Sequence, residues 1–206
     1  MSKIKEYMKL MRIKHYLKNV LIFLPLVFSG ELLDIHNLTN CIVGFIIFSF
    51  TSSIVYIIND IKDIENDKKH PIKKKRPLPL GTVSKEEAII LALVLGVIAI
   101  TLSIFVIGYE RIIAIMLLLL YLAINVAYSF GLKKKPIVDI VILVAGFLIR
   151  VLYGAVITDI ELSNWLYLTV ISGAFYMGLG KRRNEMIYQI SNDITRRQNY
   201  VSCNSI

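Results

Sequence analysis

The stretch that decides the fold is CIVGFIIFSFTSSIVYII at residues 41–58, which runs directly into NDIKDIEND at residues 59–67. The first part contains no charged side chain, and its length approaches the about 20 apolar residues that an α-helix needs to cross a bilayer. The second part brings four carboxylates into a short segment. The sequence therefore predicts a membrane helix that ends in an acidic segment.

Five further apolar windows of similar length accompany this one, at residues 17–33, 87–107, 111–130, 137–157 and 163–180. The chain is 56% hydrophobic and has a mean hydropathy of +0.64, which is too apolar for a domain with a fully wetted surface. We therefore predict an all-α, polytopic transmembrane helix bundle that forms one membrane domain over residues 1–206. We interpret the first window as a retained helix and not a signal peptide, because no Ala-x-Ala-like site precedes Glu31.

The cationic residues lie on alternate sides of the expected spans. Of the 24 lysines and arginines, 22 lie in the amino-terminal segment, the loop at residues 59–86, the loop at residues 131–136 or the polar tail at residues 181–206. Because cytoplasmic loops of membrane proteins are enriched in Lys and Arg, we predict that these four segments are cytoplasmic. The net charge of +9 is then explained by topology and by anionic membrane lipids, so we expect no nucleic-acid partner.

The acidic segment has the composition of a metal site. If the helix continued through it, Asn59, Asp63 and Asp67 would share one face, and the Asp60 side chain could turn toward them. Mg²⁺ prefers oxygen ligands and typically binds one or two carboxylates together with substrate phosphates. We therefore expect these four residues to bind Mg²⁺ and a diphosphate. A solvated helix end, balanced by the neighbouring lysines, is the structural alternative.

Cationic side chains near this segment could bind phosphate oxygens. Lys73 and Arg76 lie in the basic run that follows the acidic segment, although anionic lipid would also explain that run.

Arg150 lies about 13 residues into the fifth window, where a charge requires a buried partner or a wet cavity. Asp139 could belong to the same cavity, or it could simply compensate the helix dipole.

The fourth window carries polar side chains on one helical face. Tyr121, Asn125 and Tyr128 follow one another at helical spacing, and such groups usually face the interior of a membrane bundle. An interfacial tyrosine with a nearby snorkelling lysine is the simpler reading of this end of the window.

Four stretches of the chain resemble the UbiA prenyltransferase superfamily. They are RIKHYLKN at residues 12–19, YIINDIKDIENDKKHPIKKKRPLPLG at residues 56–81, YSFGLKKKPIVDI at residues 128–140, and the segment from GFLIR to LSNW at residues 146–165. NDIKDIEND is a full match to the superfamily's Asn-Asp-x-x-Asp-x-x-x-Asp signature. At residues 177–185, where most members have a second aspartate-rich motif, this chain has the basic MGLGKRRNE. That departure is similar to the decaprenyl-phosphate phosphoribosyltransferase branch.

The resemblance implies a bundle of nine transmembrane helices around a central cavity, of which this chain supplies about six. We therefore expect the chain to be truncated at its carboxyl end. It also implies a Mg²⁺-dependent transferase of cell-envelope synthesis, which moves a phosphoribosyl group from 5-phosphoribosyl diphosphate to a polyprenyl phosphate. The implied catalytic residues are Asp60, Asp63 and Asp67. The implied substrate-binding residues are Lys18, Asn59, Lys73, Arg76, Tyr128, Lys133, Asp139, Arg150, Lys181, Arg182 and Glu185.

Two alternatives remain open from the sequence. A prenyltransferase that moves an isoprenyl group from a prenyl diphosphate to an aromatic or other acceptor would use the same first motif. An inactive six-helix fragment, or a non-enzymatic membrane protein, would keep only the topology. The oligomeric state does not follow from the sequence.

Overall fold

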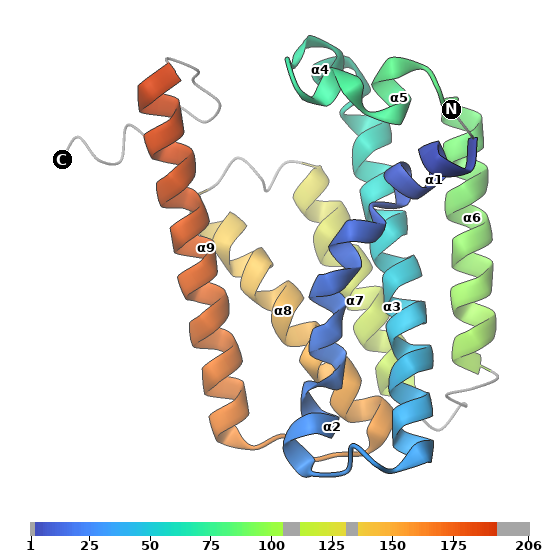
Figure 1. The fold of residues 1–206 in the computed structure, drawn as a ribbon, viewed down its shortest axis with the longest axis vertical. Coiled ribbons are helices and arrows are strands. Elements are labelled where there is room, and N and C mark those ends of the chain that lie inside the picture. Colours follow the sequence, from blue (N-terminus) through green and yellow to red (C-terminus); the bar gives the residue numbers. More distant parts are fainter. Residues whose placement is uncertain (1–2, 105–111, 131–135, 193–206) are drawn as a thin grey trace.

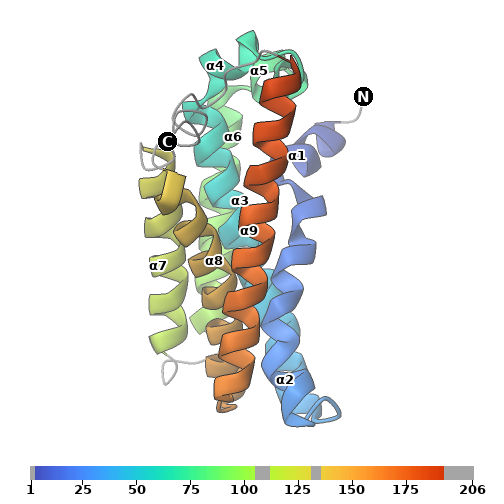
Figure 2. The ribbon, with the colours of Figure 1, turned by 90° about the vertical axis from the view of Figure 1, so that its left-hand side faces the viewer.

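The structure, a computed structural model, describes residues 3–104, 112–130 and 136–192. Within these ranges the chain forms helices joined by turns, with no β-strand, which confirms the all-α prediction. The elements are α1 (Lys3–Met11), η1 (Ile13–Phe23), α2 (Leu24–Ser29), α3 (Ile35–Lys62), α4 (Ile64–Lys69), η2 (Lys73–Lys75), α5 (Pro77–Leu80), α6 (Lys85–Leu102), α7 (Ile112–Ser129), α8 (Pro136–Thr158) and α9 (Asn164–Asn192). The long helices run roughly along one direction as a bundle, with α9 beside α8 (Figures 1 and 2).

Most of the expected membrane windows coincide with long helices. Within the described residues, three segments are long and apolar enough to cross a membrane: Ile35–Lys62, Ile112–Ser129 and Val138–Thr158. α3 starts at an Asp34 cap, whose carboxylate accepts hydrogen bonds from the backbone N–H groups of His36 (2.8 Å) and Asn37 (3.1 Å). α6 starts at a Ser84–Glu87 capping box, so charged groups occupy its first turn.

The first window does not form one α-helix, which corrects the prediction for residues 17–33. It is divided between η1, an unusually long 3₁₀-helix of 11 residues, and the short α2, which has Pro25 in its first turn. Side chains three positions apart align on a 3₁₀-helix, and here one such row faces α3. The Tyr16 hydroxyl lies 2.8 Å from Ser53 Oγ, and the Asn19 amide donates to Ser49 Oγ at 3.0 Å.

The main core lies where η1, α3, α7 and α8 meet. Phe48 of α3 packs against Tyr121 of α7 and Tyr153 of α8, with ring centroids 4.7 and 5.5 Å apart. Gly154 allows α8 to approach η1 closely, because an added Cβ would overlap the Ile22 carbonyl group. A second cluster joins α1, α3, α5 and α6. The main core includes Ile22 of η1 together with residues of α3 and α8, so it holds η1 against both helices.

The acidic and basic segments lie at one end of the bundle. α4, η2 and α5 follow the end of α3 and lie at the same end of the bundle as α1, whereas α2 lies at the opposite end (Figure 1). The described part of the amino-terminal segment and the 59–86 loop thus lie at the same end of the bundle, and their cytoplasmic location stays a prediction. The first part of the predicted polar tail, residues 181–192, continues helix α9, and residues 193–206 lie outside the described residues.

Candidate functional site

The acidic segment bends at Asp63. α3 ends at Lys62, Asp63 is its C-cap with φ −92° and ψ 8°, and α4 begins at Ile64. The prediction that Asn59, Asp63 and Asp67 share one face of a continuous helix is therefore wrong. The Asn59 side chain instead faces α7, where its Oδ1 accepts a hydrogen bond from Ser129 Oγ at 3.1 Å.

The bend brings Asp60 and Asp67 together. Both side chains are buried, each residue being 2% exposed. Arg76 Nη1 lies 3.1 Å from Asp60 Oδ1 and 2.6 Å from Asp67 Oδ2, so one nitrogen contacts both carboxylates. Arg12 forms an ion pair with Asp60, and Lys73 Nζ lies 3.4 Å from Asp67 Oδ1. Two buried carboxylates therefore converge on one cationic position, and we call them the Asp60–Asp67 pair.

The Asp60–Asp67 pair has the donor chemistry for a shared metal ion. Among the described residues, no group of three or more His, Cys, Asp or Glu side chains is arranged to hold a metal, so the predicted ligand set of Asn59, Asp60, Asp63 and Asp67 is not assembled there. Mg²⁺ nevertheless commonly takes only one or two carboxylates when substrate phosphates supply further oxygens. Asp60 and Asp67 fit that smaller requirement.

A basic opening adjoins the Asp60–Asp67 pair. This outer depression has a volume of about 370 Å³ and is lined by Lys9, Arg12, His15, Asp60, Lys75, Arg76 and Pro77. Arg12 connects it to the bundle, because its guanidinium carbon lies 4.8 Å from the centre of the Tyr56 ring. Arg12 also has a left-handed backbone, with φ 55°. We did not predict a role for Arg12 from the sequence, although its place in RIKHYLKN was a usable signal.

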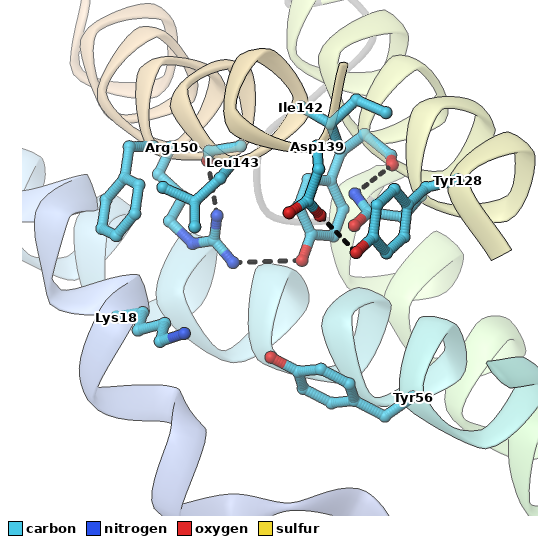
Figure 3. Close-up of a pocket in the computed structure, with 11 residues that line it drawn as sticks. Lys18, Tyr56, Tyr128, Asp139, Ile142, Leu143 and Arg150 are labelled. Carbon is cyan, nitrogen blue, oxygen red and sulfur yellow. Dashed lines mark hydrogen bonds between the residues drawn. The ribbon is translucent and has the colours of Figure 1, made fainter. Parts of the chain in front are cut away.

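A second opening, the inner cavity, lies deeper between the helices. It has a volume of about 220 Å³ and is lined by Lys18, Tyr56, Tyr121, Asn125, Tyr128, Asp139, Ile142, Leu143, Gly146, Phe147 and Arg150. Figure 3 shows Lys18 of η1 and Tyr56 of α3 on the side opposite Asp139 and Arg150 of α8. The structure thus brings the predicted polar face of α7 together with Arg150 and Asp139, and adds Lys18 and Tyr56 from η1 and α3.

Arg150 is one of three charged residues that line the inner cavity, with Lys18 and Asp139, and it is 6% exposed. Its Nε donates to Asn19 Oδ1 at 2.8 Å, its Nη2 donates to the Tyr121 hydroxyl at 3.0 Å, and its Nη1 donates to the Gly146 carbonyl oxygen. These partners are all neutral. Within the part of the chain that the structure describes, no carboxylate contacts Arg150.

Asp139 has a different environment in the same cavity. It is 4% exposed, accepts a hydrogen bond from the Tyr128 hydroxyl, and forms an ion pair with Arg182 of α9. Arg182 comes from the basic stretch that replaces a second aspartate-rich motif, so α9 supplies a cation to this wall of the cavity. Lys133 and the side chains of Lys181 and Glu185 lie outside the described residues.

Comparison with known proteins gives a consistent result. The family model described as the UbiA prenyltransferase family matches residues 21–193. The chain is 36% identical to the decaprenyl-phosphate phosphoribosyltransferase of Mycolicibacterium smegmatis, over 86% of this chain and 56% of that protein. The chain is 34% identical to the enzyme of the same name from Mycobacterium tuberculosis H37Rv, over 86% of this chain and 59% of that protein. The chain thus spans somewhat more than half the length of these curated relatives.

Relatives with other names and solved structures also match. Digeranylgeranylglyceryl phosphate synthase of Sulfurisphaera tokodaii is 30% identical, over 93% of this chain and 66% of that protein. A UbiA homolog from Archaeoglobus fulgidus bound to GPP and Mg²⁺ gives a TM-score of 0.68 at 17% identity, covering 89% of this chain and 65% of that chain. At that identity the structural likeness shows a shared fold.

Proposed function

Because this chain belongs to the UbiA prenyltransferase family, we propose that it carries the site of a Mg²⁺-dependent membrane transferase that moves a phosphoribosyl group from 5-phosphoribosyl diphosphate to a polyprenyl phosphate. The curated relatives named for decaprenyl-phosphate phosphoribosyl transfer support this branch of the family. We also propose that the end of the bundle with α1, α4 and α5 faces the cytoplasm, since it carries most of the described lysines and arginines.

One observation carries the proposal: Arg150 is a buried cation with neutral described partners. A charge within a membrane bundle requires an anion or a wet cavity, and a guanidinium suits phosphate in particular. Lys18 lines the same cavity from the opposite side. The cavity therefore suits an acceptor that brings its own negative charge, as a polyprenyl phosphate does.

The two openings suggest a division of roles between donor and acceptor. Arg76 and Lys73, which lie beside the Asp60–Asp67 pair, would bind oxygens of the donor diphosphate. Mg²⁺, when held by Asp60 and Asp67 together with that diphosphate, would neutralise charge on the leaving group. Arg150 and Lys18 would orient the acceptor phosphate in the inner cavity, with the isoprenoid extending into the bilayer.

The chemistry that these groups must support is a substitution at C1 of the ribose. The bond from C1 to the diphosphate breaks, C1 becomes oxocarbenium-like, and an oxygen of the lipid phosphate forms the new bond while diphosphate leaves. The attacking phosphate is already anionic, so no strong general base is needed. Cationic side chains that bind the leaving group and the acceptor therefore supply most of what the reaction requires.

The proposal is tested with labelled 5-phosphoribosyl diphosphate and a polyprenyl phosphate, using membranes that contain the protein. Replacing Arg150 by glutamine removes about two charge-assisted hydrogen bonds to the acceptor, so kcat/KM for the lipid should fall by about 100-fold or more. Arg183→Gln, which removes an exposed arginine of α9, is the matched control and should retain activity. Equal rates for the two variants would contradict the role of Arg150.

Supplying prenyl diphosphate and an aromatic acceptor to the same membranes tests the other branch of the family. Prenylated product without phosphoribosylated lipid would overturn the proposed reaction in favour of prenyl transfer. Transfer from neither donor would contradict both enzymatic assignments for this chain.

A further inference from the structure

The Asp60–Asp67 pair already holds a cation of the protein's own. We propose that Arg76 is a resident counter-ion that occupies the metal position of this pair, that a divalent cation displaces it, and that the released guanidinium then binds the diphosphate arriving with that cation. The inference depends on the proposed function only in taking a diphosphate as the ligand. According to this proposal, Arg76 binds the two carboxylates first and the diphosphate second.

The contacts of Arg76 place it at the convergence point of the pair. The same nitrogen, Nη1, lies 3.1 Å from Asp60 Oδ1 and 2.6 Å from Asp67 Oδ2. A metal ion that bridges these two carboxylates would need the same space. Arg12 and Lys73 each contact one carboxylate of the pair, whereas Arg76 contacts both. Of these three cations, Arg76 is therefore the one that competes directly with a bridging metal.

The position of Arg76 in the chain allows it to leave the pair. It connects η2 to α5 with an extended backbone, φ −72° and ψ 154°, and its side chain is 28% exposed. It also lines the outer depression, beside Lys75 and near Lys9. A small rotation of the side chain would move the guanidinium from the carboxylates toward an anion in that depression.

Electrostatics makes the exchange favourable only when both ligands arrive. Without a cation between them, two buried carboxylates repel strongly, so Arg76 stabilises the unloaded state. A divalent cation alone must displace Arg76 and leave it without its two carboxylate partners. A cation that brings a diphosphate supplies phosphate oxygens to the same guanidinium. Metal and diphosphate are therefore expected to bind cooperatively, with Arg76 coupling them.

The test measures Mn²⁺ binding by electron paramagnetic resonance on the purified chain in detergent, with and without inorganic pyrophosphate. Arg76→Gln should bind Mn²⁺ alone about tenfold more tightly than the wild type, a factor that corresponds to about 1.4 kcal/mol. Pyrophosphate should tighten Mn²⁺ binding in the wild type, and this gain should shrink in Arg76→Gln. Lys74→Gln removes an exposed charge from the same loop and should behave as the wild type.

Thermal melting checks that the variant is folded: Arg76→Gln should melt at a lower temperature than the wild type without Mn²⁺, and Mn²⁺ should restore it. Mn²⁺ binding by Arg76→Gln that is no tighter than wild type would overturn the proposal. So would equal tightening in Lys74→Gln, which would indicate a general charge effect, or the absence of Mn²⁺ binding in all three proteins. Neither the Mn²⁺-binding assay nor the melting assay uses a phosphoribosyl donor or a polyprenyl phosphate. Failure of the proposed reaction can therefore be distinguished from failure of Mn²⁺ to displace Arg76.

Discussion

Replacing Gly154 by alanine should separate η1 from α8. The added Cβ would overlap the carbonyl oxygen of Ile22 and lie 2.9 Å from its carbonyl carbon. Carbon atoms pack at about 3.5–4.0 Å, so the two segments must move apart by about 1 Å. Overpacking of this kind costs about 1–3 kcal/mol of folding stability. Because η1 also carries Lys18 and Asn19, the same movement should disturb the inner cavity.

Both effects of Gly154→Ala can be measured. The melting temperature in detergent should fall, and the proposed phosphoribosyl transfer should fall by up to about 100-fold, the loss that a misplacement of about 1 Å can cause in an active site. Gly173→Ala in α9 is the matched control, because nothing lies within 4 Å of a Cβ added there. If both alanine variants melted at the same temperature, the close approach of η1 and α8 inferred here would be refuted.

Two further substitutions test particular contacts. Asn19→Asp would place a carboxylate where the Asn19 Oδ1 atom now lies 2.8 Å from Arg150 Nε, so that Arg150 is paired within the protein and the melting temperature is retained. The KM for the proposed acceptor, polyprenyl phosphate, should then rise about tenfold or more, and an unchanged KM would count against an anion site at Arg150. Lys3→Ala removes the ion pair between Lys3 and Glu87, whose side chains are 68% and 31% exposed, so the free energy of unfolding should fall by less than about 1 kcal/mol. A larger loss at low salt, where the pair is least screened, would show that α1 depends on this contact.

The fold could largely be predicted from hydrophobicity, except in the first window. Apolar windows of membrane length predicted α3, α7 and α8, because hydrophobic length alone requires a helix in a bilayer. For residues 17–33 the same argument predicted one span and missed the 3₁₀ conformation of η1. That conformation is accompanied by contacts with α3, such as Tyr16 with Ser53 and Asn19 with Ser49. These contacts join residues that are far apart in the chain, so they could not be predicted from the local sequence.

The site could be predicted in part. An isolated charge in an apolar window required polar surroundings, and Arg150 indeed lies in a cavity with Tyr121. The predicted arrangement of the acidic side chains was wrong. Residues 59–67 are compatible with one continuous helix, but the chain bends at Asp63. The bend accompanies the return of the chain through Arg76, which contacts residues 9 and 16 positions away. Helical spacing could not predict such a contact.

The helix type of η1 determines how its cationic side chains are oriented toward the outer depression and the inner cavity. Arg12 and His15 line the outer depression, Lys18 lines the inner cavity, and the three recur at every third position. A 3₁₀-helix turns by about 120° and advances by about 2.0 Å per residue, against about 100° and 1.5 Å in an α-helix. His15 and Lys18 both lie within η1, and converting this segment to an α-helix would rotate Lys18 by about 60° relative to His15 and shorten their axial separation by about 1.5 Å. Substitutions that favour an α-helix over the 3₁₀-helix of η1 would thus change how the side chains of the two openings are oriented relative to each other, without removing any lysine or arginine.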